Sequence, residues 1–124
     1  SQATDKFMEM MGMDFEYIKL TNESYFTVET HIRHINEAKE GMKILAKTQV
    51  LEASGKKLRL FHILQTENGK IVATGEHMLL HVSLRTRSSS LPSEKIASNL
   101  SKLFQPHSNL PWPEGAGRSI GNQK

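Results

Sequence analysis

The residues best suited to acid–base chemistry lie in one stretch that predicts a β-strand, residues 24–35. Successive side chains of a strand alternate between its two faces, so Glu29, His31 and Arg33 share one face. A carboxylate beside an imidazole can act as a general base next to a group that orients a polar substrate. The alternative is structural: Glu29 and Arg33 form an ion pair, and His31 fills space.

Six histidines raise the question of a metal site. His31 and His34 are three residues apart and therefore point to opposite faces of their strand. His77 and His81 share a face, but at the rise of an extended chain they lie about 13 Å apart. Zinc requires ligands that converge within roughly 2 Å of the ion. We therefore predict no metal site and no cofactor.

Basic residues flank two of the predicted strands. Lys57 and Arg59 follow a glycine-containing turn, and Arg85 follows the last predicted strand. Each group can hold a phosphate through charge-assisted hydrogen bonds. The alternative is a solvated surface position, which is the more common outcome for a single lysine.

Four stretches predict the strands that position these residues, because they combine β-branched and aromatic residues with turns at their ends. They cover residues 24–35, 42–52, 57–66 and 71–84. Short turns join the last three into an antiparallel meander. The pair Asn68-Gly69 predicts a type I′ hairpin turn, and Gly75 indicates a bulge or a close backbone approach.

The first residues predict an amphipathic helix. Its apolar stripe has the spacing i, i+4, i+7 and i+8 and consists of Ala3, Phe7, Met10 and Met11. Gly12 is a natural C-terminal stop, and Asp14 can cap a short second helix over residues 15–20. The methionines of this segment are expected to fill the core, with a flexible pocket wall as the alternative.

The C-terminal part predicts a helix and an irregular tail. Ser93 can cap a helix over residues 93–104. From Gln105 onward, three prolines and three glycines argue against a helix or a central strand. We therefore divide the chain into a domain of residues 1–104 and a tail of residues 105–124. A helix against a curved antiparallel sheet makes the fold class α+β.

Composition narrows the function. The chain of 124 residues is the size of one domain, and its formal charge of +3 fits an anionic small ligand. No Arg/Lys-rich run with interleaved aromatics predicts nucleic-acid binding, and no apolar stretch reaches the roughly 20 residues that cross a bilayer. The absence of cysteine excludes thiol catalysis and agrees with a cytoplasmic protein.

Several stretches resemble a known family. FTVETHIRHINEAKEGMKILAKTQVLEASGKKLRLFHILQTENGKIVATGEHMLLHV resembles the 4-hydroxybenzoyl-CoA-thioesterase-like branch of the hot-dog superfamily. More narrowly, ATDKF with TVETHIRH, GEHMLLHV and LPWPEGAGRSIG are similar to the betainyl-CoA thioesterases of bacterial carnitine breakdown, which occur alone or fused to carnitine dehydrogenase. The resemblance implies a hot-dog fold, in which a curved antiparallel sheet wraps a central helix, and hydrolysis of a short acyl-CoA thioester.

One motif of that family is absent. Its members begin with a strand and a loop that carries an Asp and a Gly-His-Met/Asn signature, and Ser1 corresponds to a point inside the helix that follows. We therefore expect an N-terminally truncated domain, with the main catalytic carboxylate in a preceding segment. The helix start would carry the oxyanion donors, because its first N–H groups are unpaired and partly positive.

The resemblance also implies roles for residues that are present. Glu29 would act as the general base, and His31 would orient the acyl group. The substrate-binding residues would be Tyr25, Arg33, Lys57, Arg59, Arg85 and Arg118. A trimethylammonium acyl group would favour an aromatic cage, and the candidates for it are Tyr17, Tyr25, Phe26 and Trp112.

The expected partner is an acyl-CoA substrate bound by a homodimer or homotetramer, with no nucleic acid and no membrane. A different function is also open: a non-catalytic hot-dog module that binds an acyl-CoA or mediates oligomerisation, within a protein fused to carnitine dehydrogenase.

Overall fold

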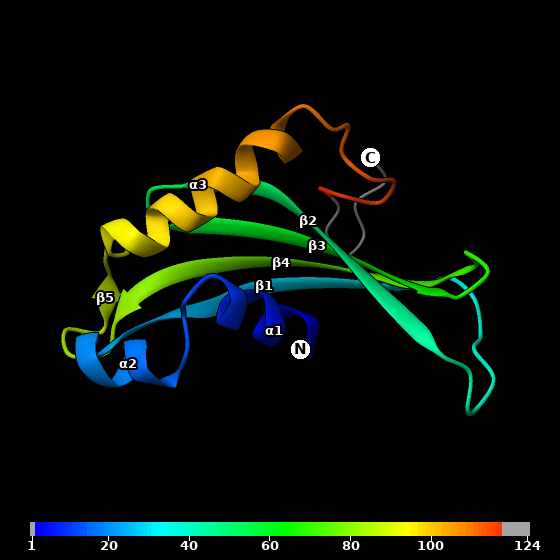
Figure 1. Ribbon diagram of the computed structural model, residues 1–124, viewed down its shortest axis with the longest axis horizontal. Coiled ribbons are helices and arrows are strands. Elements are labelled where there is room, and N and C mark those ends of the chain that lie inside the picture. Colours follow the sequence, from blue (N-terminus) through cyan, green and yellow to red (C-terminus); the bar gives the residue numbers. More distant parts are fainter. Residues whose placement is uncertain (1, 118–124) are drawn as a thin grey trace.

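The computed structural model describes residues 2–117, and within them it contains three helices and five strands (Figure 1). In chain order these are α1 (Gln2–Met10), α2 (Phe15–Thr21), β1 (Glu23–His34), β2 (Ile44–Ser54), β3 (Lys57–Thr66), β4 (Ile71–Ser83), β5 (Ser88–Ser89) and α3 (Glu94–Ser108). The four long strands confirm the strands predicted from the sequence. No helix of the described part is long and apolar enough to span a membrane.

The strands form one curved antiparallel sheet in the order β1-β4-β3-β2, and β5 pairs with β4 (Figure 1). The last long strand, β4, therefore lies between β1 and β3. Strands β2, β3 and β4 form the predicted meander. The register is shifted between Thr27 and Glu29 in β1. Gly75 shows no bulge and pairs in register with Ile32 and His62.

The turn between β3 and β4 differs from the predicted type. A type I′ turn needs positive φ at both central residues, but Gly69 is at +90° and Asn68 is not among the residues with positive φ. The Gly69 N–H instead donates to the Thr66 carbonyl at 2.9 Å. This is the hairpin in which a type I turn is followed by a left-handed glycine.

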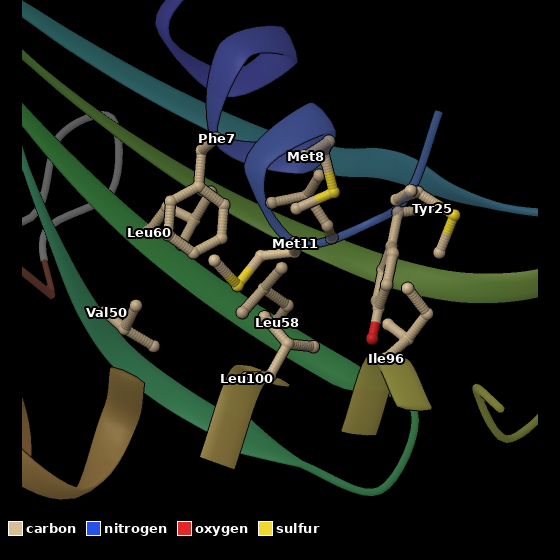
Figure 2. Packing of buried hydrophobic residues seen from close by; sticks show 11 residues of the cluster. Phe7, Met8, Met11, Tyr25, Val50, Leu58, Leu60, Ile96 and Leu100 are labelled. Atoms are coloured by element: carbon tan, nitrogen blue, oxygen red, sulfur yellow. The ribbon is translucent and has the colours of Figure 1, made fainter. Parts of the chain in front are cut away.

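Helices α1 and α3 share one hydrophobic core on one face of the sheet, which we call the helix face (Figure 2). This face carries the side chains of Tyr25, Leu58, Leu60 and Leu79. Ile96 and Leu100 of α3 complete the core beside Phe7 and Met8 of α1. The helix therefore seals the apolar side of the sheet, as the α+β prediction requires.

The caps of α2 and α3 are as predicted, and Phe7 and Met11 of the predicted apolar stripe are buried, but Met10 is not. The Asp14 carboxylate accepts from the Tyr17 N–H at 3.0 Å, and the Ser93 hydroxyl caps α3. In α1, Met10 is 74% exposed. Thr4 and Met8 are buried beside Phe7. The polar Thr4 is accommodated because its hydroxyl pairs with a buried histidine of the sheet.

The C-terminal helix is longer than predicted. It extends four residues beyond Phe104 and contains Pro106. The His107 side chain explains how this last turn is held, because its Nδ1 accepts a hydrogen bond from the backbone N–H of Val50 at 2.9 Å. This contact fixes the end of α3 against β2, and the chain then crosses to the opposite side of the sheet.

Candidate functional site

A large cavity opens on the helix face beside the first turn of α1. Its volume is about 830 Å³. Most of its wall is aliphatic, with contributions from Ile32, Ile44, Leu45, Ala46, Leu64 and Ala73. Gln2 and Lys6 of α1 also line it. A cavity of this size and polarity suits a small acyl group.

Two buried histidines lie in this cavity wall, in addition to the exposed side chains of Gln2, Lys6 and His34. The rings of His62 and His77 lie 5.3 Å apart, and the two side chains are 3% and 7% exposed. His62 lies between two hydroxyls: its Nε2 is 2.8 Å from Thr4 Oγ1, and its Nδ1 is 2.8 Å from Thr48 Oγ1. His77 Nδ1 is 3.0 Å from Thr30 Oγ1. Each ring is therefore fixed by threonines rather than by carboxylates.

Burial keeps this pair neutral. Desolvation, with a smaller contribution from His77, lowers the pKa of His62 to about 4. Desolvation also lowers the pKa of His77, although Glu76 opposes the shift. A neutral imidazole offers one N–H donor and one acceptor, so at neutral pH the pair supplies hydrogen bonds without adding charge to an apolar cavity.

A third histidine is buried elsewhere on the helix face. His81 is 0% exposed. Its Nε2 is 3.2 Å from the Tyr17 hydroxyl, and its Nδ1 is 3.0 Å from the Ser90 carbonyl oxygen. The Tyr25 ring meets it edge-on at 4.9 Å. Both ring nitrogens are engaged, so this histidine ties α2 and β5 to the sheet.

The predicted pair Glu29 and His31 lies on the opposite face of the sheet, which we call the tail face because residues 109–117 contact it. There they border a small cavity of about 10 Å³ with Arg59, Glu76 and Met78. The register explains this grouping, since Glu29 is paired with Met78 and His31 with Glu76. The structure thus brings Glu29, His31 and Arg59 together, but away from the helix-face cavity.

Glu76 is the centre of the tail face and is 5% exposed. Its Oε2 accepts from Arg59 Nη1 at 2.5 Å, and its Oε1 accepts from the Gly117 N–H at 2.7 Å. The Arg59 guanidinium also lies 5.9 Å from the centre of the Trp112 ring and 3.8 Å from Glu52. A buried carboxylate is tolerated here because an arginine and a backbone N–H compensate it.

The other predicted binding residues are dispersed. Arg33 packs against the backbone of Gly115 in the tail, and Tyr25 belongs to the core. Lys57 lines a third cavity at the β2–β3 turn, whereas Arg85 is exposed in the turn before β5. Arg118 lies outside the described residues.

The four candidate cage aromatics do not converge. Tyr17 and Tyr25 both contact His81 on the helix face. Phe26, next to Tyr25 in the strand, points to the opposite face and is exposed, and Trp112 covers Arg59. Residues 2–117 also contain no group of three or more His, Cys, Asp or Glu side chains arranged to hold a metal ion.

His62 was not among the site residues predicted from the sequence, although the pattern of its strand sets it apart. In the run Leu58, Leu60, His62 and Leu64, one histidine occupies a leucine face of the strand at period two. A histidine in such a row must find partners or remain neutral. His77 and Glu76 were expected on opposite faces of β4, and this is confirmed by their partners.

Comparisons with known proteins agree with this architecture. The model of the thioesterase-like superfamily matches residues 1–100. An L-carnitine dehydrogenase/betainyl-CoA thioesterase of Ruegeria pomeroyi is 48% identical over 97% of this chain, which spans only 24% of that protein. A betainyl-CoA thioesterase of Pseudomonas aeruginosa is 37% identical over 98% of this chain and 77% of its own length.

Among solved structures, a hypothetical protein of Staphylococcus aureus in complex with CoA superposes with a TM-score of 0.90 at 23% identity. The match covers 96% of this chain and 75% of that one. It supports the fold, in which a curved antiparallel sheet packs on α1. The chain therefore has the hot-dog fold and belongs to the thioesterase-like superfamily.

Proposed function

We propose that this chain hydrolyses a short acyl-CoA thioester to the free acid and CoA, and that betainyl-CoA is its substrate. The observation that carries the proposal is the 37% identity, over most of both chains, with the betainyl-CoA thioesterase of Pseudomonas aeruginosa. The helix-face cavity supports it, because its aliphatic wall can receive the methyl-rich end of such an acyl group.

The cavity also agrees with a cationic acyl group in one respect. The two buried histidines in its wall, His62 and His77, have lowered pKa values and so carry no charge at neutral pH. A charged imidazolium would repel a trimethylammonium group, whereas a neutral ring does not. In this proposal the reaction needs no cofactor besides the CoA of the substrate, and the protein acts in the cytoplasm as a homo-oligomer.

The residue roles inferred from the resemblance remain predictions within this function. Glu29 as general base and His31 as orienting group would require the thioester to reach the tail face. Lys57, Arg59, Arg85 and Arg118 as CoA ligands, with Tyr25 and Arg33, likewise await substitution. The division into a domain of residues 1–104 and a tail of residues 105–124 is also a proposal, and the contacts of Gly115 and Gly117 with the sheet favour a tail that is docked.

The test is release of CoA by the intact protein from betainyl-CoA, acetyl-CoA and a longer, neutral acyl-CoA, monitored by thiol detection. We expect the highest kcat/KM for betainyl-CoA. A protein that releases CoA from none of them but binds CoA would instead support the non-catalytic acyl-CoA-binding module.

A further inference from the structure

One ring nitrogen in the wall of the helix-face cavity has no protein partner among the described residues. Both nitrogens of His62 are already engaged by threonine hydroxyls. Thr74 lines the cavity with its backbone, because strand alternation turns its side chain to the tail face. In the described part of the chain, His77 Nε2 has no hydrogen-bond partner, although its side chain is 7% exposed.

Glycine at position 75 keeps the space in front of this atom open. A Cβ atom at Gly75 would lie 3.4 Å from His77 Nε2, and both residues line the cavity. The side chain of any other residue would extend into the volume that a ligand needs to approach the ring. The unpartnered nitrogen therefore faces the cavity rather than packed protein.

The contact on the other ring nitrogen can set the tautomer. Thr30 Oγ1 lies 3.0 Å from His77 Nδ1. When the hydroxyl donates to Nδ1, the ring proton is on Nε2, and Nε2 becomes a donor directed into the cavity. An N–H donor in a desolvated wall binds an oxygen acceptor more strongly than it would in water.

We propose that His77 Nε2 donates a hydrogen bond to the carbonyl oxygen of a thioester whose acyl group occupies the helix-face cavity, with Thr30 as the residue that positions the ring. A neutral donor beside aliphatic side chains matches an uncharged acceptor, such as the carbonyl oxygen of an acyl thioester. The proposal rests on the proposed function and adds the residue that contacts the substrate.

Two substitutions at this position separate the two ring nitrogens. In His77→Asn the amide can replace Nδ1 toward Thr30, but nothing replaces Nε2. In His77→Gln the longer amide reaches the place of Nε2. The intact protein is titrated calorimetrically with two non-hydrolysable probes: a CoA ketone in which a methylene replaces the thioester sulfur, and S-ethyl-CoA, which has no carbonyl.

We expect His77→Asn to weaken binding of the ketone about tenfold and to leave the affinity for S-ethyl-CoA unchanged, as for loss of one buried hydrogen bond. His77→Gln should recover most of the ketone affinity. Thr30→Val, at an exposed position where misfolding is no concern, should weaken ketone binding about threefold because the tautomer is no longer fixed. His81→Asn is the matched control and should leave the ratio of the two affinities unchanged.

Equal weakening of both probes by His77→Asn, or no change in either, overturns the proposal. The proposal is also overturned if the affinity for the ketone is unchanged in both Thr30→Val and His77→Asn. An intact protein that binds neither probe and hydrolyses no acyl-CoA refutes the proposed function as well. A protein that hydrolyses acyl-CoA but gives the same affinity ratio in His77→Asn as in the parent refutes only the contact proposed for His77.

Discussion

The two faces of the sheet bury ionisable side chains in different ways: one keeps them neutral, and the other pairs the charge with an opposite one. On the helix face, His62 and His77 are surrounded by hydroxyls and aliphatic side chains, and their pKa values fall. On the tail face, Glu76 is buried with an arginine and a backbone N–H as partners. The first arrangement avoids charge, and the second compensates it.

This difference separates a surface with an open cavity from one whose main ion pair is already formed. On the tail face Arg59 is shared by Glu76, Glu52 and Trp112. Among the buried side-chain atoms of the described residues, its Nε, 3.8 Å from Glu52, is the one left without a hydrogen-bond partner. The helix face leaves Nε2 of His77 open beside a cavity of about 830 Å³. The two clusters should therefore respond differently to substitution, with stability affected on the tail face and ligand binding on the helix face.

The largest effect is expected from Glu76→Ala, which leaves the Arg59 guanidinium without its main partner. Loss of one member of a buried ion pair costs about 3 kcal/mol of unfolding free energy. Urea denaturation measures this. The matched control is Glu52→Ala, whose carboxylate lies 3.8 Å from Arg59 and is partly exposed, so it should cost less than about 1 kcal/mol. Similar losses in the two variants would show that Glu76 is not the centre of this face.

The second largest effect is expected from acid, which should destabilise the packing of the helix face. Because burial lowers the pKa values of His62, His77 and His81, the unfolded chain binds protons first as the pH falls below the ordinary histidine value of 6.5. The unfolding free energy is then highest above pH 6.5 and decreases as the pH falls from 6.5 toward 4.

Urea midpoints measured across this pH range test the effect. In His62→Gln the unfolding free energy should decrease less as the pH falls, since glutamine cannot take up a proton. His34→Gln serves as the control, because His34 is exposed and its substitution should leave the pH dependence as it was. A pH dependence that is identical in His62→Gln and in the parent would contradict a neutral, buried His62.

Trp112→Ala should have a smaller effect, confined to stability. The indole lies over the Arg59 guanidinium, and a cation–π contact of this kind contributes about 1 kcal/mol. We expect denaturation at slightly lower urea and an unchanged kcat/KM. Leu110→Ala removes another exposed apolar residue of the tail as a control. A selective loss of betainyl-CoA hydrolysis in Trp112→Ala would support the predicted aromatic cage for the trimethylammonium group.

Glu29→Gln is expected to have the smallest effect. Glu29 is exposed and lies on the face opposite the helix-face cavity, so kcat/KM should change less than about threefold, below the factor of at least 100 typical for loss of a general base. A loss of that larger size would support the role predicted from the resemblance. It would also place the reaction on the tail face, and so reverse the comparison of the two faces.

Much of this architecture could be predicted from local patterns. The four strands, the caps at Asp14 and Ser93 and the opposite orientation of Glu76 and His77 follow from propensity, capping chemistry and the two-residue period of a strand. These features depend on neighbours in the chain. The sequence likewise determines that Glu29, His31 and Arg33 share a face, as their places on the tail face confirm.

Which face receives which element was decided by tertiary structure alone. Thr4 meets His62 across 58 positions of the chain, and Gly117 meets Glu76 across 41. No periodicity encodes such contacts, because they depend on how α1 docks and on where the chain crosses the sheet after α3. For that reason the sequence identifies the histidines as strand residues, while only the packed structure makes one pair neutral and opens one of its nitrogens to a cavity.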